Sequence, residues 1–169
     1  MNLSHPYYFE PLGDHERASF SCGSPELDDY FHRQVGQDAK RKVAAPFVMV
    51  DQARRILGYY TLSAYGVRLG ELPAAVAKKL PKYPLIPATL LGRLAVSRDH
   101  RGQKLGKLLL MDALYRSWKN TLEVASAGVV AEAIDEAAQN FYLHHEFIPL
   151  AEHPGKLFIA MGTIEKVFG

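Results

Sequence analysis

The residues best suited to chemistry lie in a basic stretch at positions 96–107, which reads Val-Ser-Arg-Asp-His-Arg-Gly-Gln-Lys-Leu-Gly-Lys. An apolar run precedes it and a segment with helical spacing follows, so the stretch is expected to join a strand to a helix. The N–H groups and the positive dipole at the start of a helix attract anions, and Arg101, Lys104 and Lys107 add positive charge there. This pattern predicts a phosphate site, with a basic surface turn as the alternative.

The spacing of the glycines excludes two common phosphate-binding motifs. A P-loop needs glycine, four residues and then Gly-Lys-Ser/Thr, whereas Gly102 and Gly106 are separated by three residues and Leu108 follows Lys107. The chain contains no Gly-x-Gly-x-x-Gly sequence either. A phosphate bound at this stretch must therefore be held by another scheme.

Other reactive groups are sparse. Cys22 is the only cysteine, so an intramolecular disulfide and cysteine zinc sites are excluded. The histidines have no metal-ligand spacing, so no metal is expected. The chain has 169 residues, of which 48% are hydrophobic, and it has no apolar run long enough to span a membrane. Because the N-terminus shows no signal-peptide pattern, we expect a cytoplasmic protein with no membrane partner.

The elements that position these residues are expected to form one mixed α/β domain over residues 1–169, with an open mixed sheet flanked by helices. Ser24, Pro25 and Glu26 are typical of a helix start. Residues 66–87 contain four prolines and are expected to form a long connection with a short helix at 74–80. Two further helices are expected over residues 105–118 and 135–142. The expected strands are residues 7–9, 46–50, 56–62, 90–96, 124–133, 147–150 and 157–161.

Positive charge is concentrated in residues 33–107. This segment carries fifteen Lys and Arg against four Asp and Glu, although the net charge of the whole chain is only +2. Such a concentration is typical of proteins that bind phosphate-rich partners, either a nucleic acid or a cofactor. A solvated basic face is the alternative.

Residues 101–106, Arg-Gly-Gln-Lys-Leu-Gly, resemble the pyrophosphate-binding motif Arg/Gln-x-x-Gly-x-Gly/Ala of GNAT-type N-acetyltransferases. The resemblance implies a GNAT-like fold with a splayed strand pair, and acetyl-CoA as the cosubstrate. Lys104 replaces the first motif glycine, and we expect it to have a negative φ, at which lysine is tolerated. The residues implied to bind the cofactor, mainly through backbone groups, are Leu94, Ala95, Val96, Arg101, Gly102, Gln103, Lys104, Leu105, Gly106 and Lys107.

Residues 138–147 resemble a later pattern of the same family, Ala-x-x-Phe-Tyr-x-x-x-Gly-Phe, with Glu146 in place of the glycine. The resemblance implies that Tyr142 is the general acid and that Asn140 contacts the CoA arm; without it, a core-packing role for Tyr142 would be favoured. A tyrosine with an ordinary pKa of about 10 is protonated at neutral pH, so it can give a proton to a leaving thiolate. No side chain stands out as a general base, although His144 and His145 lie nearby.

Three further blocks, residues 20–31, 58–63 and 91–96, resemble the tRNA-acetylating GNAT toxins of type II toxin–antitoxin systems, and this similarity covers nearly the whole chain. It implies acetylation of the α-amine of aminoacyl-tRNA, which blocks translation, together with a homodimer and a ribbon-helix-helix antitoxin. Two other functions stay open, namely acetylation of a small amine or a protein amine, and a non-catalytic RNA-binding module. The residues expected to bind RNA are Arg33, Lys40, Arg41 and Lys42.

Overall fold

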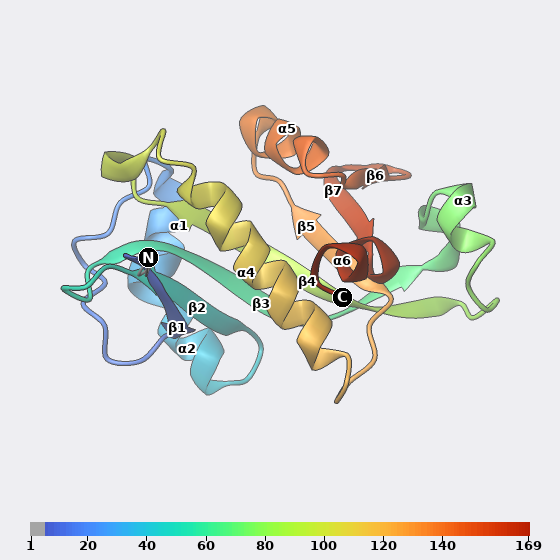
Figure 1. Ribbon diagram of the computed structural model, residues 1–169, viewed down its shortest axis with the longest axis horizontal. Helices are drawn as coiled ribbons and strands as arrows, with labels where there is room; N and C mark the ends of the chain where they lie inside the picture. The colour runs from blue at the N-terminus through green and yellow to red at the C-terminus, as the bar shows by residue number, and fades with distance from the viewer. Residues whose placement is uncertain (1–5) are drawn as a thin grey trace. The chain divides into compact units, whose positions relative to one another are not determined.

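The computed structural model describes residues 6–169 and is a mixed α/β structure with a seven-stranded open sheet flanked by helices, which confirms the expected fold class (Figure 1). The strands are β1 (Tyr8–Pro11), β2 (Ala45–Val50), β3 (Ile56–Arg68), β4 (Leu85–Val96), β5 (Gly128–Glu132), β6 (Ile148–Leu150) and β7 (His153–Ala160). Their order is β1-β2-β3-β4-β5-β7-β6. Strands β4 and β5 pair in parallel, whereas β1–β2, β2–β3, β5–β7 and β6–β7 are antiparallel.

Within residues 6–169, six α-helices and three short helical segments lie between or after the strands. The α-helices are α1 (Pro25–Asp29), α2 (Val35–Lys40), α3 (Ala74–Ala77), α4 (Leu105–Asn120), α5 (Glu136–His144) and α6 (Met161–Phe168). The short segments are η1 (Tyr30–Gln34), η2 (Leu69–Glu71) and η3 (Arg98–His100). Within residues 6–169 no helix is both long and apolar enough to cross a bilayer. Residues 1–5, on which the expectation of no signal peptide partly rests, lie outside the described part.

Contacts between residues divide the chain into two compact units, which are described separately. The first unit consists of Met1–Leu62 and Arg93–Ala113, and the second of Ser63–Gly92 and Leu114–Gly169. Strands β3 and β4 and helix α4 contribute residues to both units. The expectation of one domain over residues 1–169 stays a prediction.

The first unit contains a helical run, formed by α1, η1 and α2, whose type changes along its length. It begins where the sequence predicts, because Pro25 opens the first turn and Ser24 Oγ accepts a hydrogen bond from the Leu27 N–H at 3.5 Å. Segment η1 is a π-helix, in which the Val35 N–H bonds to the Tyr30 carbonyl five residues earlier. The run therefore contains one more residue than a continuous α-helix with the same number of turns would contain.

Strand β3 is covered on both faces within the first unit. Tyr59 packs in a buried cluster with the helical run, and its hydroxyl donates to a carbonyl of α1 at 2.8 Å. The adjacent residue Tyr60 points to the other face, where its hydroxyl donates to Asp112 Oδ2 of α4 at 2.6 Å. A Cβ added to Gly58 would lie 2.9 Å from the Ala95 carbonyl oxygen, so only glycine permits this close approach of β4. The cluster consists of Phe20, Cys22, Leu27, Tyr30, Phe31, Val35, Val48, Val50, Ile56, Tyr59 and Ala95.

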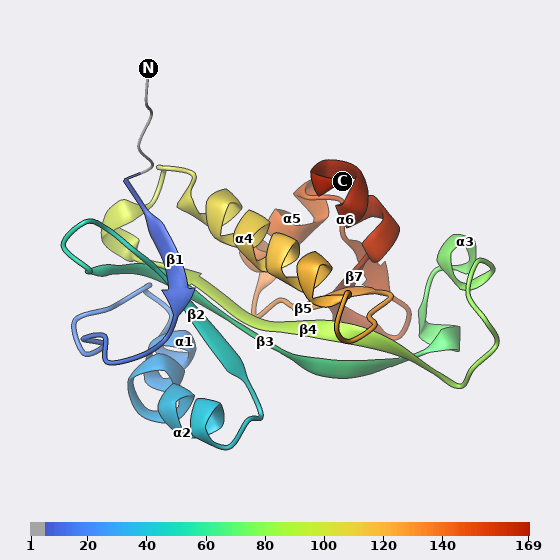
Figure 2. The same ribbon diagram turned by 60° about the horizontal axis from the view of Figure 1, so that its bottom comes forward.

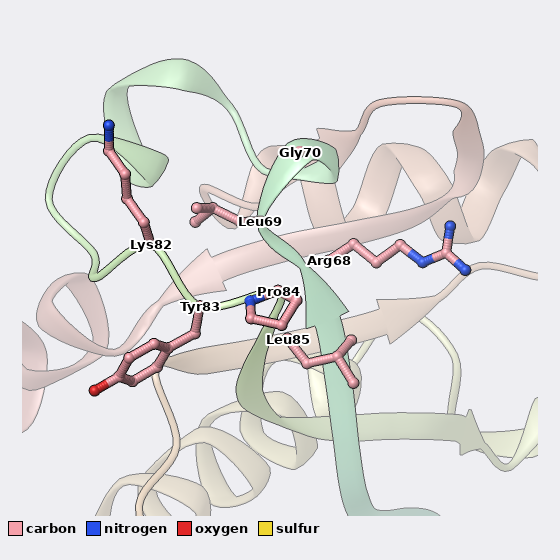
Figure 3. A pocket seen from close by; sticks show the side chains of 7 residues that line it. All are labelled: Arg68, Leu69, Gly70, Lys82, Tyr83, Pro84 and Leu85. Carbon is pink, nitrogen blue, oxygen red and sulfur yellow. The ribbon is translucent and has the colours of Figure 1, made fainter.

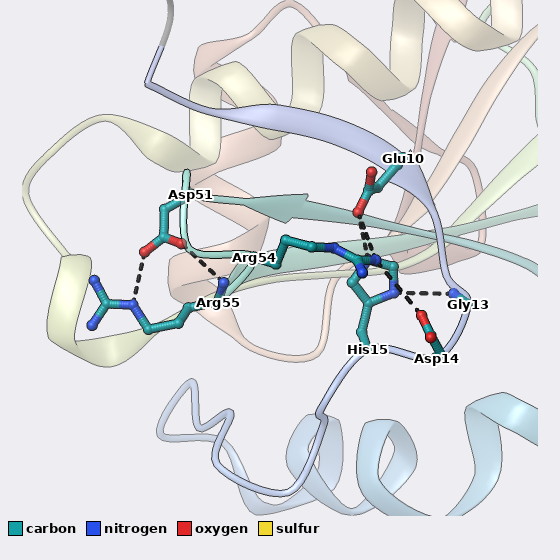
Figure 4. Close-up of polar contacts among 7 residues, drawn as sticks. All are labelled: Glu10, Gly13, Asp14, His15, Asp51, Arg54 and Arg55. Atoms are coloured by element: carbon teal, nitrogen blue, oxygen red, sulfur yellow. Dashed lines mark hydrogen bonds and ion pairs between the residues drawn. The ribbon is translucent and has the colours of Figure 1, made fainter.

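A buried histidine ties the loop after β1 to the turn between β2 and β3 (Figure 4). The side chain of His15 is only 2% exposed. Its Nδ1 accepts from the Gly13 N–H at 3.0 Å, so the ring proton lies on Nε2, which donates to Glu10 Oε1 at 2.6 Å. This hydrogen bond lowers the pKa of Glu10. Arg54 adds ion pairs of 3.5 Å to Glu10 and 3.7 Å to Asp14, which complete the connection between loop and turn.

The second unit has its own buried core and an arm, defined as residues 63–92. The arm contains the end of β3, η2, α3 and the start of β4, and Figure 2 shows α3 beyond the ends of the two strands. Residues of the arm are part of the core, so the arm is anchored in this unit. The core cluster consists of Val67, Leu72, Ile86, Ala88, Val130, Leu150 and Phe158.

Three expectations about the second unit have the wrong bounds or omit an element, although the short helix expected in the arm is present as α3. The proline-containing segment 66–87 is not one long connection, because β3 runs to Arg68 and β4 begins at Leu85. Buried and exposed side chains alternate in both extensions, as in any half-buried strand. The final strand ends at Ala160, and an amphipathic helix with Ile164 buried follows it. The expected strand at 124–133 is shorter and spans Gly128–Glu132.

Candidate active site

The loop between β4 and α4 belongs to the first unit and is fixed by backbone hydrogen bonds. The Ser97 N–H donates to a carbonyl of β3 at 2.8 Å, and the Arg98 N–H donates to the Ser21 carbonyl at 2.9 Å. Segment η3 then turns the chain, Gly102 has a φ of +82°, and α4 begins at Leu105. The predicted order of strand, loop and helix is therefore present.

The backbone N–H groups of residues 102–107 donate to no acceptor within the described residues 6–169. Those of residues 105–107 lie in the first turn of α4, where an α-helix has no acceptor for them. The side chains of Gln103, Lys104 and Lys107 are exposed in the same stretch. A row of donors at the positive end of a helix, with cations beside it, fits an anion with several oxygens such as a pyrophosphate.

The backbone conformation expected for Lys104 is wrong. Its φ is +60° rather than negative. This left-handed conformation costs a residue with a Cβ about 1–2 kcal/mol, whereas glycine adopts it readily. Lysine thus stands at this motif position in the conformation for which glycine is suited, and its exposed side chain adds a cation to the loop.

Arg101 is held by a carbonyl group from a distant part of the first unit. Its Nη2 donates to the Cys22 carbonyl, 79 positions away in the sequence. The loop that carries this carbonyl is fixed by Asp28, whose carboxylate accepts from the Cys22 N–H at 2.9 Å and from Ser21 Oγ at 3.0 Å. Burial alone would raise the pKa of Asp28, but these hydrogen bonds lower it. Sequence analysis missed Asp28 and Cys22 as supports of Arg101, because no local pattern reports such a distant contact.

The strand residues implied to hold the cofactor are the last three of β4, Leu94, Ala95 and Val96. The side chains of Ala95 and of Leu105, at the start of α4, are buried, so only their backbone groups are available to a ligand. The register between β4 and β5 ends at Leu91, although β4 continues to Val96. This early end of the pairing is the pattern expected for a splayed strand pair.

Tyr142 lies on α5 in the second unit and is therefore described apart from the loop. Helix α5 begins at Asp135, whose side chain accepts from a first-turn N–H at 2.8 Å. It ends in a Schellman motif, in which the Glu146 N–H donates to the Leu143 carbonyl at 3.2 Å and the Phe147 N–H to the Tyr142 carbonyl at 3.1 Å. The rings of Tyr142 and Phe147 pack with centroids 5.1 Å apart. The motif thus fixes both the backbone and the ring of Tyr142.

Tyr142 has the properties of an acid that stays protonated. Its side chain is 3% exposed, and burial raises its pKa above the ordinary value. Its hydroxyl makes no hydrogen bond within residues 6–169. Asn140 is exposed on the same helix, as is His144, while the His145 ring packs on Phe141 with centroids 4.8 Å apart. The structure therefore provides a neutral phenol on α5 with its proton unshared.

Replacing Glu146 with glycine is expected to raise the free energy of unfolding by about 0.5–1 kcal/mol. Glu146 is the left-handed residue of the Schellman motif, with a φ of +72°, and glycine removes that strain at the cost of a more flexible unfolded chain. Thermal unfolding should show a rise in Tm of about 1–4 °C. Glu146→Ala is the matched control, since it removes the charge and keeps the Cβ. An equal rise for alanine would contradict the backbone explanation.

The four residues expected to bind RNA are exposed in the first unit. Arg33 lies on η1, and Lys40, Arg41 and Lys42 lie together at the end of α2. Lys42 ends the helix in the left-handed conformation, with a φ of +63°. The helix dipole also favours cations at a helix C-terminus, so these residues can be explained by the stability of the helix alone. RNA binding by them stays a prediction.

Comparison with known proteins gives the family. The acetyltransferase (GNAT) domain model matches residues 45–149, more than half of the chain. The chain belongs to the GNAT acetyltransferase family. The GNAT chain is also 30% identical over 152 residues to a tRNA-acetylating toxin of Mycobacterium tuberculosis, a match that covers 90% of each protein. It is 26% identical over 170 residues to the probable toxin TacT of Sinorhizobium fredii, covering 95% of this chain and 94% of the relative.

Solved structures of related toxins have the same fold. AtaT complexed with acetyl-methionyl-tRNA has a TM-score of 0.89 and 31% identity, covering 96% of the GNAT chain and 99% of that chain. AtaTR bound with acetyl-CoA has a TM-score of 0.86 and 30% identity, covering 97% and 99%. The GNAT chain is accordingly an acetyltransferase, and its cosubstrate is acetyl-CoA. The individual residues that bind this cosubstrate stay predicted.

Proposed function

We propose that this chain is a toxin that transfers the acetyl group of acetyl-CoA to the α-amine of aminoacyl-tRNA and thereby blocks translation. The similarity to a tRNA-acetylating toxin over 90% of both chains carries this proposal. The relative AtaT, complexed with acetyl-methionyl-tRNA, supports an N-acetylated aminoacyl-tRNA as the product. The exposed cations at the end of α2 add positive charge suited to an RNA backbone.

The loop at 102–107 and the side chain of Arg101 are proposed to hold the pyrophosphate of acetyl-CoA. The unpaired N–H groups of this loop and its exposed lysines fit that role. Acetyl-CoA, when bound, supplies a thioester carbonyl that a neutral amine can attack. Backbone groups at the end of β4, where pairing with β5 has ended, are proposed to hold the pantetheine arm, and Asn140 of α5 is proposed to contact it.

Tyr142 is proposed to donate its phenolic proton to the thiolate sulfur as the carbon–sulfur bond breaks and the amine nitrogen bonds to the acetyl carbon. The amine proton leaves to water, and the phenolate recovers a proton from solvent. The α-amine of an aminoacyl group has a pKa of about 7.7–8.0, whereas that of lysine is about 10.4. Part of the α-amine is therefore neutral near pH 7 and can react without a side chain acting as a general base. This agrees with the sequence, in which no general base stands out.

We propose further that the protein is cytoplasmic, forms a homodimer as one domain per chain, and is neutralised by a ribbon-helix-helix antitoxin. Related structures show AtaT bound to the C-terminus of the antitoxin AtaR and acetyl-CoA, which supports an antitoxin partner. Sedimentation of the purified protein, alone and with the antitoxin, measures both associations. A monomer at micromolar concentration would contradict the proposed dimer.

The deciding experiment follows acetyl transfer from radiolabelled acetyl-CoA. The protein is incubated with total aminoacyl-tRNA, with deacylated tRNA, and with a polyamine and a lysine-containing peptide. Label that appears only on charged tRNA supports the proposal, because only charged tRNA carries the α-amine. Label on the polyamine or peptide alone would assign the enzyme to small-molecule or protein amines instead. Binding of RNA with no transfer to any acceptor would leave a non-catalytic RNA-binding module.

Replacing Lys40, Arg41 and Lys42 together with alanine is expected to lower the affinity for tRNA at least tenfold. Phosphate contacts release counterions, so the slope of log affinity against log salt should also flatten, by about 1 for each cation in contact. Filter binding at several salt concentrations measures both quantities. Lys166→Ala, which removes an exposed cation on α6, is the control. Unchanged affinity and slope in the triple variant would place the RNA elsewhere.

A further inference from the structure

The arm of the second unit carries an open groove of about 570 Å³ that has no part in the site described above. Figure 3 shows Lys82 and Tyr83 on one side of Pro84 and Leu85, with Arg68 extending on the other. The residues that line the groove are Arg68, Leu69, Gly70, Lys82, Tyr83, Pro84 and Leu85. Its size is that of a site for a small molecule or a single nucleotide.

The groove rests on a fixed base. Val67, Leu72 and Ile86, which neighbour the lining residues in sequence, belong to the buried core of the second unit. Glu71 adds polar contacts, since its carboxylate accepts from the Arg68 N–H at 3.3 Å and pairs with His153 at 2.9 Å. The groove is therefore held in shape before any ligand arrives, which lowers the entropic cost of binding.

The lining combines an exposed aromatic ring with cations. Tyr83 is 61% exposed and Leu85 58% exposed. Within residues 6–169 no ring or cation packs on Tyr83. The face of its ring is thus available to a flat partner, and Leu85 gives that partner an apolar floor.

The charge of the arm selects an anionic partner. Its cations are Arg68, Lys78, Lys79 and Lys82, all of them exposed. Its single acid is Glu71, which is already paired with His153. A flat, apolar group flanked by negative charge is complementary to this surface, and an unpaired nucleotide is such a group.

We propose that the groove binds an unpaired nucleotide of the RNA substrate. Tyr83 stacks on the base, and Arg68 and Lys82 contact the phosphates on either side of it. This inference rests on the proposed function, because it takes RNA as the substrate. It adds a second point of contact to the basic end of α2, and it is independent of base identity because every base offers a face for stacking.

Binding of labelled deacylated tRNA to the full-length protein, measured against salt concentration, tests the groove. Tyr83→Ala is expected to weaken binding about tenfold with an unchanged salt slope, while Tyr83→Phe keeps the wild-type affinity. Lys82→Ala and Arg68→Ala should each reduce the slope by about 1. In the acetylation assay the three alanine variants should raise KM for aminoacyl-tRNA and leave KM for acetyl-CoA unchanged. Tyr8→Ala, at another exposed tyrosine, is the matched control.

Two results would overturn the proposal. Affinity within twofold of wild type together with an unchanged salt slope in all the groove variants would show that RNA does not use the groove. Variants that bind tRNA normally but escape neutralisation by the antitoxin would assign the groove to an acidic peptide. Failure of the proposed function is a separate result, because it appears in the wild-type protein as absence of label on aminoacyl-tRNA. Since the substituted side chains are exposed, an unchanged Tm confirms that the variants are folded.

Discussion

Replacing Tyr142 with phenylalanine is expected to lower kcat for acetyl transfer by roughly 10²–10⁴-fold, the usual contribution of a placed general acid. The change removes only the hydroxyl, and the packing of the ring against Phe147 at 5.1 Å remains. The phenol has no hydrogen-bond partner within residues 6–169, so stability should change little. Single-turnover rates with aminoacyl-tRNA and unchanged acetyl-CoA affinity by calorimetry together measure this effect.

The pH dependence of the rate separates an acid from a packing residue. Because burial raises the pKa of Tyr142, the phenol stays protonated throughout the neutral range and the rate should show no decline from its ionisation below about pH 10. The rate should instead rise with pH as the substrate amine becomes neutral. Tyr115→Phe, at a half-exposed tyrosine on α4, controls for loss of a hydroxyl. A Tyr142→Phe rate within threefold of wild type would remove Tyr142 as the acid.

Replacing Arg101 with glutamate is expected to weaken acetyl-CoA binding at least tenfold. A charge-assisted hydrogen bond contributes about 1.5–3 kcal/mol, and the substitution both removes one and sets a carboxylate against the pyrophosphate. It also removes the contact with the Cys22 carbonyl, which loosens the support of the loop. Isothermal titration calorimetry with acetyl-CoA measures the affinity.

Two variants distinguish a direct contact between Arg101 and the pyrophosphate from the long-range electrostatic attraction of the loop's positive charges. Arg98→Glu makes the same change of charge at an exposed position in η3. It is expected to lower the affinity for acetyl-CoA by less than threefold. Arg101→Gln keeps hydrogen-bond donors without the charge, so its affinity for acetyl-CoA should lie between those of the wild type and Arg101→Glu. Equal losses in Arg98→Glu and Arg101→Glu would indicate a field effect alone. No loss in either would remove Arg101 from the pyrophosphate site.

Local signals in the sequence predicted much of the fold. The caps at Ser24 and Asp135 act within a few residues, and helices α1 and α5 begin where these caps lie. The apolar run before residue 97 predicted the end of β4 at Val96, although the strand begins earlier, at Leu85. The prolines of the arm misled the prediction, because Pro84 lies next to the start of β4 and Pro87 is exposed within it, where a missing N–H is tolerated. Helix α6 was missed because its N-cap makes no side-chain hydrogen bond.

The candidate site was predictable in its residue types and only partly in its geometry. The loop and Tyr142 were predicted as site residues from short motifs, and their roles stay predictions. The positive φ of Lys104 ran against the ordinary preference of a residue with a Cβ, so the expectation failed there. The contact of Arg101 with Cys22 depends on how the chain folds back over 79 positions, which no local pattern contains.

The π-helical segment η1 has a consequence for how the chain can vary in length. Successive residues of an α-helix are rotated by about 100° about its axis. The bond from the Val35 N–H to the Tyr30 carbonyl spans five residues instead of four, so it fits one extra residue into a turn of the helix. Deleting a single residue between positions 30 and 34 would convert the run into an unbroken α-helix. Leu27 and Phe31 could then stay in the core only if the basic end at Lys40 faced a different direction. Homologues that differ by one residue here should therefore present their positive charge on a rotated face.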